Sequence, residues 1–282
     1  MASNNLRVIY QNLADLSTTT ITASTTAGVT AAANLQKDAK SLIWRSTGTS
    51  ATLTVAFGGS KNIRGVILPF TNLTSTGTIN VTCTGGSTTS TGNILAAPYA
   101  QTDSWDSTYL PTGANSYAYG AGTYARAWFS SVQVCTGVTI VLTDTNLTYI
   151  EASRLIIGDY WSPTFNTSFG LVSSPKSLSA NSRTESGDLV TNRGIQYNTM
   201  NFDLSWLTPT DRAIFTKIIK SNGINKGIFI SLFPNNGTNT LDATIDYDKE
   251  QTYQIYGKLS TLADIAHPMY TMYTAKVDIE EI

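Results

Sequence analysis

The chain has 282 residues, of which 41% are hydrophobic and 13% are charged, and its formal net charge is -1. Such a chain can bury a core, but it lacks the clustered Lys and Arg with which proteins neutralise phosphates, so we do not expect a nucleic-acid partner. One His and two Cys leave little for catalysis or metal binding. We therefore predict a protein that is not an enzyme and that needs no cofactor or metal, built as two domains because of its length.

The N-terminal sequence, residues 1–10, lacks the basic stretch and apolar run that are typical of a secretory signal. No stretch approaches the roughly 20 apolar residues of a membrane-spanning helix. We therefore expect neither export by that route nor insertion into a membrane.

Residues 1–160 are predicted to form an antiparallel β-sandwich or jelly roll. Short β-branched and aromatic runs alternate with clusters of Gly, Ser and Asn, which is typical of these folds. Within residues 51–57, Leu53, Val55 and Phe57 alternate with Thr and Ala, so this strand should bury one face. Further strands are expected at 8–10, 42–44, 65–68, 78–82, 127–129, 132–134, 138–142 and 149–157.

Residues 83–125 lack a regular pattern and are rich in aromatic residues. We expect a surface excursion, because long irregular segments of compact domains often carry function. Aromatic rings can stack on sugar rings while polar neighbours bind the hydroxyls, which makes this segment a candidate carbohydrate site. The alternative is that these rings pack on the sandwich or on a neighbouring subunit. The candidate residues are Trp105, Tyr109, Tyr117, Tyr119 and Tyr124.

Residues 161–282 are predicted to form an α+β, barrel-like domain with one main helix near 208–222. The boundary is expected at Gly158–Pro163, where glycine, aromatic residues and proline end a strand and redirect the chain. Thr208 fits the N-cap of the helix, Pro209 its first position and Gly223 its stop. Strands on which the helix would pack are expected at 196–204, 227–233, 252–259 and 269–279.

Catalytic constellations find little support in the sequence. The single histidine, His267, precedes a proline in a predicted turn, and no Gly-x-Ser-x-Gly motif accompanies the serines. Two carboxylate pairs, Asp103 with Asp106 and Glu185 with Asp188, have the residue types of a glycosidase site. Spacing alone does not place either pair across a cleft, so we predict no catalytic residue.

The densest acidic group lies within residues 241–250. It supplies oxygen ligands but lacks the cadence and the glycine turn of a calcium loop. We therefore interpret it as a solvated strand edge. Its members are Asp242, Asp246, Asp248 and Glu250.

The two cysteines, Cys83 and Cys135, lie in predicted strands, and neither belongs to a CxxC motif or has a histidine nearby. We interpret them as buried free thiols. A disulfide is the alternative, and it would need adjacent strands and an oxidising compartment.

Several segments of the first half, among them Asn62-Ile-Arg-Gly-Val-Ile-Leu68, resemble the galactose-binding-like (discoidin-like) jelly-roll modules of tailed-bacteriophage virion proteins. The other segments are 34–35, 44–46, 54–57, 71–73 and 154–163. The second half is similar to phage distal-tail and tail-tip proteins, whose β-barrel carries one helix. That resemblance rests on the capped helix and on 202–207, 227–234, 256–259 and 279–282.

The resemblance implies a structural or adaptor component of a phage tail, at the tail tip, the baseplate or the fibre-attachment region. Such a protein is made in the cytoplasm of the bacterial host and joins the virion as a symmetric ring or cluster, with copies of itself and other tail proteins as partners. The alternative function is a carbohydrate- or receptor-binding module that contacts glycans of the host surface.

Overall fold

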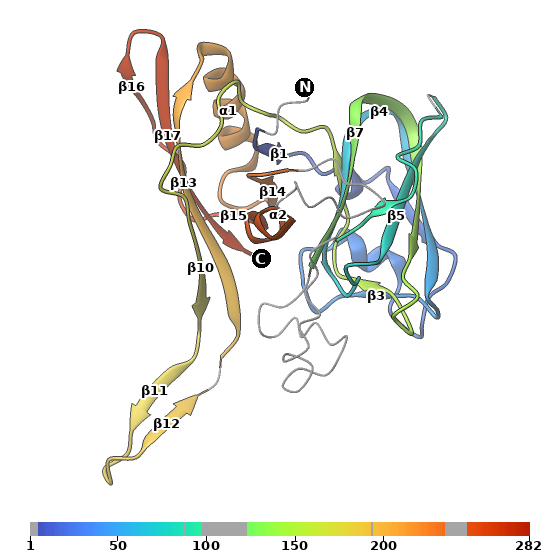
Figure 1. The fold of residues 1–282 in the computed structure, drawn as a ribbon, viewed down its shortest axis with the longest axis horizontal. Coiled ribbons are helices and arrows are strands. Elements are labelled where there is room, and N and C mark those ends of the chain that lie inside the picture. The colour runs from blue at the N-terminus through green and yellow to red at the C-terminus, as the bar shows by residue number, and fades with distance from the viewer. Residues whose placement is uncertain (1–4, 87, 98–122, 193, 235–246) are drawn as a thin grey trace.

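The computed structural model describes residues 5–86, 88–97, 123–192, 194–234 and 247–282. Two β-rich halves lie side by side in it, and a long hairpin projects from one of them (Figure 1). The pairings between the named strands are antiparallel. The predicted mostly-β class, with one main helix, is confirmed.

The first half is built on an eight-stranded sheet in the order β3-β8-β4-β7-β5-β6, with β2 and β9 paired to β4. Two strands, β4 (Ser50–Thr71) and β7 (Thr123–Thr143), pair along most of their length, and register shifts between their segments let the sheet fold around a core. The remaining elements are η1 (Leu13–Asp15), β2 (Thr20–Ala23), η2 (Ala32–Gln36), β3 (Trp44–Arg45), β5 (Thr78–Thr84), β6 (Ile94–Leu95), β8 (Glu151–Ala152) and β9 (Ile156–Gly158).

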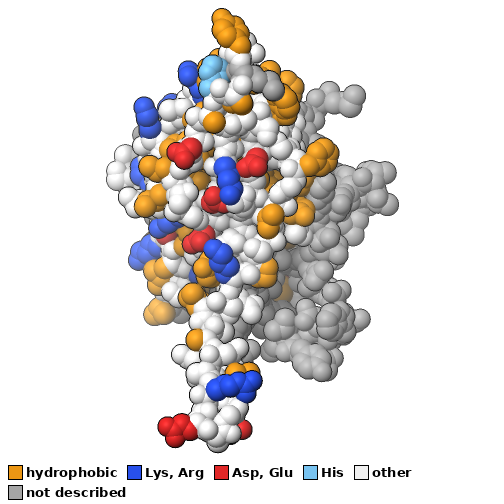
Figure 2. Space-filling view, turned by 90° about the vertical axis from the view of Figure 1, so that its left-hand side faces the viewer, with side chains coloured by type: hydrophobic (Ala, Val, Ile, Leu, Met, Phe, Trp, Pro, Cys, Tyr) orange, Lys and Arg blue, Asp and Glu red, His pale blue; other side chains and the backbone are white. Residues whose placement is uncertain are grey.

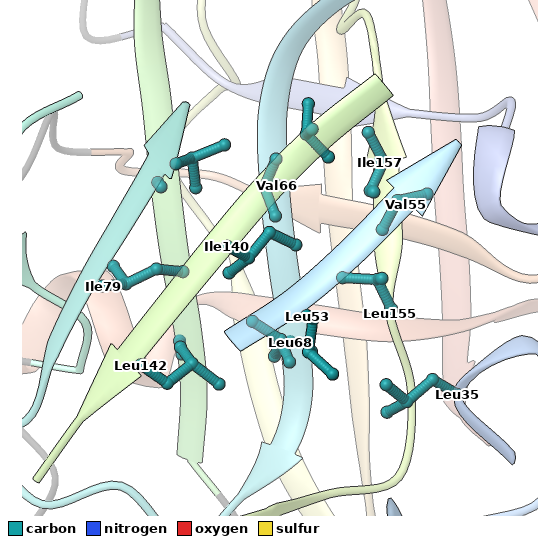
Figure 3. Packing of buried hydrophobic residues seen from close by; sticks show 14 of the residues in the cluster. Leu35, Leu53, Val55, Val66, Leu68, Ile79, Ile140, Leu142, Leu155 and Ile157 are labelled. Atoms are coloured by element: carbon teal, nitrogen blue, oxygen red, sulfur yellow. The ribbon is translucent and has the colours of Figure 1, made fainter. Parts of the chain in front are cut away.

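The core of the sandwich follows the predicted alternation in β4. Leu53, Val55 and Phe57 are at most 1% exposed. Between them, Thr54 is exposed, and Thr52, just before Leu53, is half-buried. Figure 3 shows the side chains of Leu53 and Val55 packed among Ile140 and Leu142 of β7. Each fully buried side chain of this kind stabilises the fold by about 1.5–3 kcal/mol, so this cluster holds the half together.

The second half is built on a sheet in the order β1-β14-β15-β17-β13-β10, with β16 paired to β17. Its helix α1 (Pro209–Asn222) begins as predicted: the Thr208 hydroxyl accepts a hydrogen bond from the Asp211 amide at 3.2 Å. Gly223 ends the helix with a φ of 54°. The other elements are β1 (Arg7–Ile9), β10 (Val172–Ser177), β11 (Ala180–Arg183), β12 (Leu189–Asn192), β13 (Gln196–Leu207), β14 (Ile228–Ser231), α2 (Tyr247–Thr252), β15 (Gln254–Leu259), β16 (Ile265–Met269) and β17 (Met272–Glu281).

The N-terminal strand β1 belongs to the sheet of the second half, although it lies within residues 1–160, the range expected for the first domain. It pairs with β14, and its Val8 exchanges backbone hydrogen bonds of 2.8 and 2.9 Å with Trp161. Leu6 and Val8 are buried in the core of the second half, which explains why the strand leaves the sandwich. The chain thus passes between the halves twice, and Gly158 permits the close approach, because a Cβ there would lie 2.6 Å from the Gln11 carbonyl oxygen.

An apolar cluster joins the two halves. It contains Trp128 of β7 and Phe229 of β14, whose ring centroids are 6.3 Å apart, together with Tyr124 at 6.0 Å from Phe229. Phe70 belongs to the same cluster and has a φ of 55°, a conformation that bulky residues seldom adopt. Packing between the halves therefore holds a strained residue in place.

A buried ion pair also joins the halves. Arg126 of β7 and Glu250 of α2 have side chains only 0% and 1% exposed, and the guanidinium donates to both carboxylate oxygens, at 2.9 and 2.8 Å. The interpretation of the acidic group as a solvated strand edge is therefore wrong for Glu250, which lies in a helix and is held by an arginine from a distant strand. Asp248 lies in the same helix, whereas Asp242 and Asp246 fall outside the described residues.

Both cysteines are free and buried, as predicted. Burial, and after it the neighbouring Cys135, raises the pKa of the Cys83 thiol to about 12, so this side chain stays protonated at neutral pH.

Within the described residues, no helix is both long and apolar enough to cross a membrane.

Candidate functional site

Four of the five aromatic residues predicted to form a carbohydrate site, Trp105, Tyr109, Tyr117 and Tyr119, lie outside the described residues. Tyr124 is 5% exposed and lies in the cluster between the two halves. Its hydroxyl donates to Glu281 at 3.1 Å and accepts from the Tyr256 amide at 3.1 Å. The structure thus corrects the prediction for Tyr124, because its ring has no free face for a sugar.

The remaining predicted polar groups do not gather into a catalytic site. His267 lies on the exposed strand β16 rather than in a turn, and its ring stacks on Tyr273 with centroids 4.4 Å apart. Glu185 and Asp188 are exposed at the tip of the β11–β12 hairpin, with no opposite wall in the described part of the chain. The pair Asp103 and Asp106 lies outside the described residues.

A cleft of about 1100 Å³ opens between the two halves. One wall comes from the sandwich, through Ser60–Asn62 of β4 and through η1, and the opposite wall comes from α1 and the loop that follows it. The floor consists of the two segments that cross between the halves, residues 10–12 and 159–161. Ligand sites are common at such domain interfaces.

Two asparagines hold the floor and one wall of the cleft in place. The Asn12 amide donates to the Leu155 carbonyl oxygen at 2.9 Å, and its oxygen accepts from the Ile157 amide at 2.9 Å. Asn222 of α1 donates to the Tyr10 carbonyl oxygen at 2.7 Å, which ties the helix to the floor. Trp161 is 7% exposed and stacks on Phe215 with centroids 5.8 Å apart. These contacts fix the shape of the cleft, and they do not involve its exposed side chains.

The three carboxylates that line the cleft are held by arginines. Arg154 lies 2.6 Å from Asp15 and 2.8 Å from Asp38, and Arg64 forms an ion pair with Asp159. Burial raises the pKa of Asp15 against the lowering effect of Arg154. Two guanidiniums thus pair with three carboxylates, which leaves one negative charge at the cleft.

The lysines of the cleft, in contrast, form no ion pair with any described residue. They come from both walls: one lies on β4, one on α1 and one in the loop after α1. Two of the three are exposed and one is half-buried. Three lysines against one remaining carboxylate charge give the cleft an excess of positive charge, in a chain whose net charge is -1. These residues are Lys61, Lys217 and Lys226.

Tyr160 supplies a fixed aromatic ring at the cleft. The Arg64 guanidinium lies 4.1 Å from its ring centroid and the Arg7 guanidinium 4.8 Å from it, and Trp128 meets it edge-on at 5.4 Å. Arg64 also donates to the Tyr160 carbonyl oxygen at 2.7 Å. These cation–π contacts hold the half-buried ring in a single orientation.

The second candidate surface is the projecting hairpin, which consists of β10, β11, β12 and the N-terminal half of β13 and which we call the arm. β10 pairs with β13 at the edge of the second sheet, and the hairpin continues as β11 paired with β12, a two-stranded sheet on its own. Figure 2 shows the arm extending below the body, with charges of both signs at its tip.

The arm exposes apolar side chains along its length. All residues of β11 and β12 are exposed, and five apolar side chains of the arm are between 50% and 62% exposed. A two-stranded hairpin without a packed face is marginally stable in water, and an open strand edge can pair with another chain. The arm therefore has the character of a contact surface. The five residues are Val172, Leu178, Leu189, Val190 and Ile195.

Neither the cleft nor the arm was predicted from the sequence. The segment of the arm is rich in Ser, Thr and Asn and has little alternation, although the turn residues Ser186-Gly187 between Arg183 and Leu189 are a hairpin signal. The cleft has no local signal, because its walls come from segments that are far apart in the sequence.

No protein-family model matches this chain, and neither does any curated protein. About half of it is similar to solved carbohydrate-binding modules. The family 32 module of Clostridium perfringens NanJ, solved with galactose, is 12% identical, and the match covers 55% of this chain and 99% of the module with a TM-score of 0.38. A second family 32 module from the same organism, solved with GalNAc-β-1,3-galactose, is 13% identical over 53% of this chain and 100% of the module, with a TM-score of 0.37.

Chitosan-binding module 1 of a chitosanase/glucanase from Paenibacillus sp. IK-5 is 20% identical, with a TM-score of 0.36 over 53% of this chain and 99% of the module. Likenesses at 12–20% identity concern the fold alone. What the cleft and the arm do has to be argued from their own residues.

Proposed function

We propose that this protein is a non-enzymatic structural or adaptor component of a bacteriophage tail, which joins copies of itself and other tail proteins through the arm. The observation that carries the proposal is the arm: a hairpin that leaves the body, buries almost nothing and exposes apolar side chains along its length. The resemblance of the sequence to tail-tip and distal-tail proteins supports the proposal of a tail, and a location in the virion is part of that proposal.

The physical reason is the cost of an isolated hairpin. Ordering each backbone residue costs about 1–2 kcal/mol, and the β11–β12 hairpin recovers little of this through burial within its own chain. Contact with a neighbouring molecule would bury the apolar side chains and satisfy the open strand edges. An assembly protein gains from such a surface, whereas a monomer gains nothing.

Replacing residues 179–194 by Asn-Gly should abolish self-association and leave the body folded. Leu178 and Ile195 already form a cross-strand backbone hydrogen bond of 2.9 Å, so a two-residue turn can close the shortened hairpin. Size-exclusion chromatography with light scattering measures the outcome: the full chain should be an oligomer and the shortened chain a monomer with an unchanged circular-dichroism spectrum.

A milder variant separates the apolar contact from the length of the arm. Leu189→Thr with Val190→Thr gives both positions a β-branched side chain that favours a strand while removing apolar surface, so it should weaken the oligomer without unfolding the arm. A full-length protein that stays monomeric at high concentration and that is absent from purified virions would overturn the assembly function.

A second candidate function, glycan binding, is favoured by the cleft. The cleft offers exposed amide side chains of Gln11, Asn62 and Asn225 that make no hydrogen bond to any described residue. Amide groups can donate hydrogen bonds to sugar hydroxyls and accept them. A tail protein with such a site would contact saccharides of the host surface.

A glycan array probed with the labelled full-length protein tests this function. We expect a signal on a subset of saccharides, and we expect it to fall for Asn62→Ala, which removes an exposed amide at the mouth of the cleft. Val29→Ala, at a 95% exposed position elsewhere on the surface, is the matched control. The absence of signal on every saccharide would contradict glycan binding and would leave the assembly function untouched.

A further inference from the structure

We infer that the cleft between the two halves selects acidic saccharides, such as oligosaccharides of uronic acids, over neutral ones. This inference rests on the second proposed function, the binding of a glycan in the cleft, and it names the chemical class of the ligand.

The distribution of charge carries the inference. Arg154 and Arg64 pair with the three carboxylates of the cleft and leave one negative charge, while three lysines on the two walls have no carboxylate partner among the described residues. Because Lys61 lies on the sandwich and Lys217 on α1, a ligand between the walls would face positive charge from both sides. Opposite charges in a cleft with protein walls attract more strongly than on an open surface.

The uncharged groups of the cleft favour a sugar over an acidic peptide. The exposed amides of Gln11, Asn62 and Asn225 and the hydroxyl of Ser60 offer donors and acceptors that match the many hydroxyls of a saccharide. Apolar side chains also line the cleft, among them the exposed Leu16 and the half-buried Leu13 and Ile214, and they can contact the apolar faces of sugar rings. A carboxylated saccharide would pair with the lysines through its carboxylates and would form hydrogen bonds with the amides and the serine through its hydroxyls.

Isothermal titration calorimetry of the full-length protein tests the inference with two probes on the same backbone. The first probe is tetragalacturonate, and the second is its methyl ester, which keeps the sugar rings and removes the negative charge. We expect the acid to bind more tightly than the ester. We also expect its affinity to fall several-fold between about 50 mM and about 500 mM NaCl, because salt screens exposed charges.

Two neighbouring lysines provide a matched pair of variants. Lys217 lines the cleft, whereas Lys220 lies on the same helix, is exposed and does not line the cleft. Lys217→Gln should weaken binding of tetragalacturonate by about two- to five-fold, the size of one exposed charge pair. Lys220→Gln should leave it unchanged. Both positions are on the surface, so neither variant should unfold the protein.

The outcomes distinguish the selection of acidic saccharides from glycan binding itself. Equal binding of acid and ester would overturn the selection of acidic saccharides and leave glycan binding in place. Binding of the acid that Lys217→Gln does not weaken would overturn the placement in the cleft, and equally tight binding of a poly-glutamate peptide would overturn the choice of a saccharide. Binding of neither probe, together with a silent glycan array, would remove glycan binding itself.

Discussion

Replacing Glu250 with alanine should lower the free energy of unfolding by about 3–5 kcal/mol, because it leaves the guanidinium of Arg126 buried without its carboxylate. Both side chains are almost completely buried, and Arg126 also donates to the Ala96 carbonyl oxygen at 3.4 Å. The arginine therefore cannot turn to water without breaking further contacts. Urea denaturation followed by circular dichroism measures the change.

An exposed ion pair gives the control for this prediction. Lys176 and Glu280 lie 3.0 Å apart with side chains 51% and 42% exposed, so Lys176→Ala should change the stability by no more than about 1 kcal/mol. The double variant Arg126→Leu with Glu250→Leu should recover much of the loss, because it removes both charges from the interior. An effect of Glu250→Ala no larger than that of Lys176→Ala would show that this contact does not join the halves.

The elements with strong local signals were predicted from the sequence. The cap residues Thr208 and Gly223 place helix α1 within one residue of its observed start and at its observed end. The alternation around Leu53 fixes the buried face of β4. In each case, the determining contacts lie within a few residues of one another, so the local pattern is sufficient.

The elements without such signals were missed. β2 and β6 are short strands that form by pairing with the longer strands β4 and β5. β10, β11 and β12 carry too few apolar residues to show a period. The expected break at residue 160 follows from the turn residues there, but β1 joins the second sheet for a reason that lies far along the chain: Leu6 and Val8 complete its core.

The candidate sites depend still more on distant contacts. The pairing of Arg154 with both Asp15 and Asp38 joins three separate segments of the sequence. The interpretation of the acidic group as solvated fails at Glu250 of α2, because its partner Arg126 lies on β7, far from it in the sequence. Composition alone could not say where a surface for a partner or a ligand lies.

Phe229→Ala should lower the free energy of unfolding by about 3–5 kcal/mol and should also uncouple the two halves. The ring is 0% exposed and contacts Tyr124 and Trp128 across the interface, so its loss leaves a cavity where the halves meet. Phe57→Ala is the matched control, because Phe57 is equally buried but lies inside the sandwich core.

The two phenylalanine variants should differ in how they unfold. With Phe229→Ala, the halves should melt in separate steps in calorimetry, and the amides of β14 should exchange hydrogen faster than in the wild type, since the apolar cluster packs the two halves against each other. With Phe57→Ala, the loss should be confined to the sandwich. If Phe229→Ala melts in one step with unchanged exchange in β14, the floor and walls of the cleft are held together by the crossing segments and their asparagines rather than by the apolar cluster.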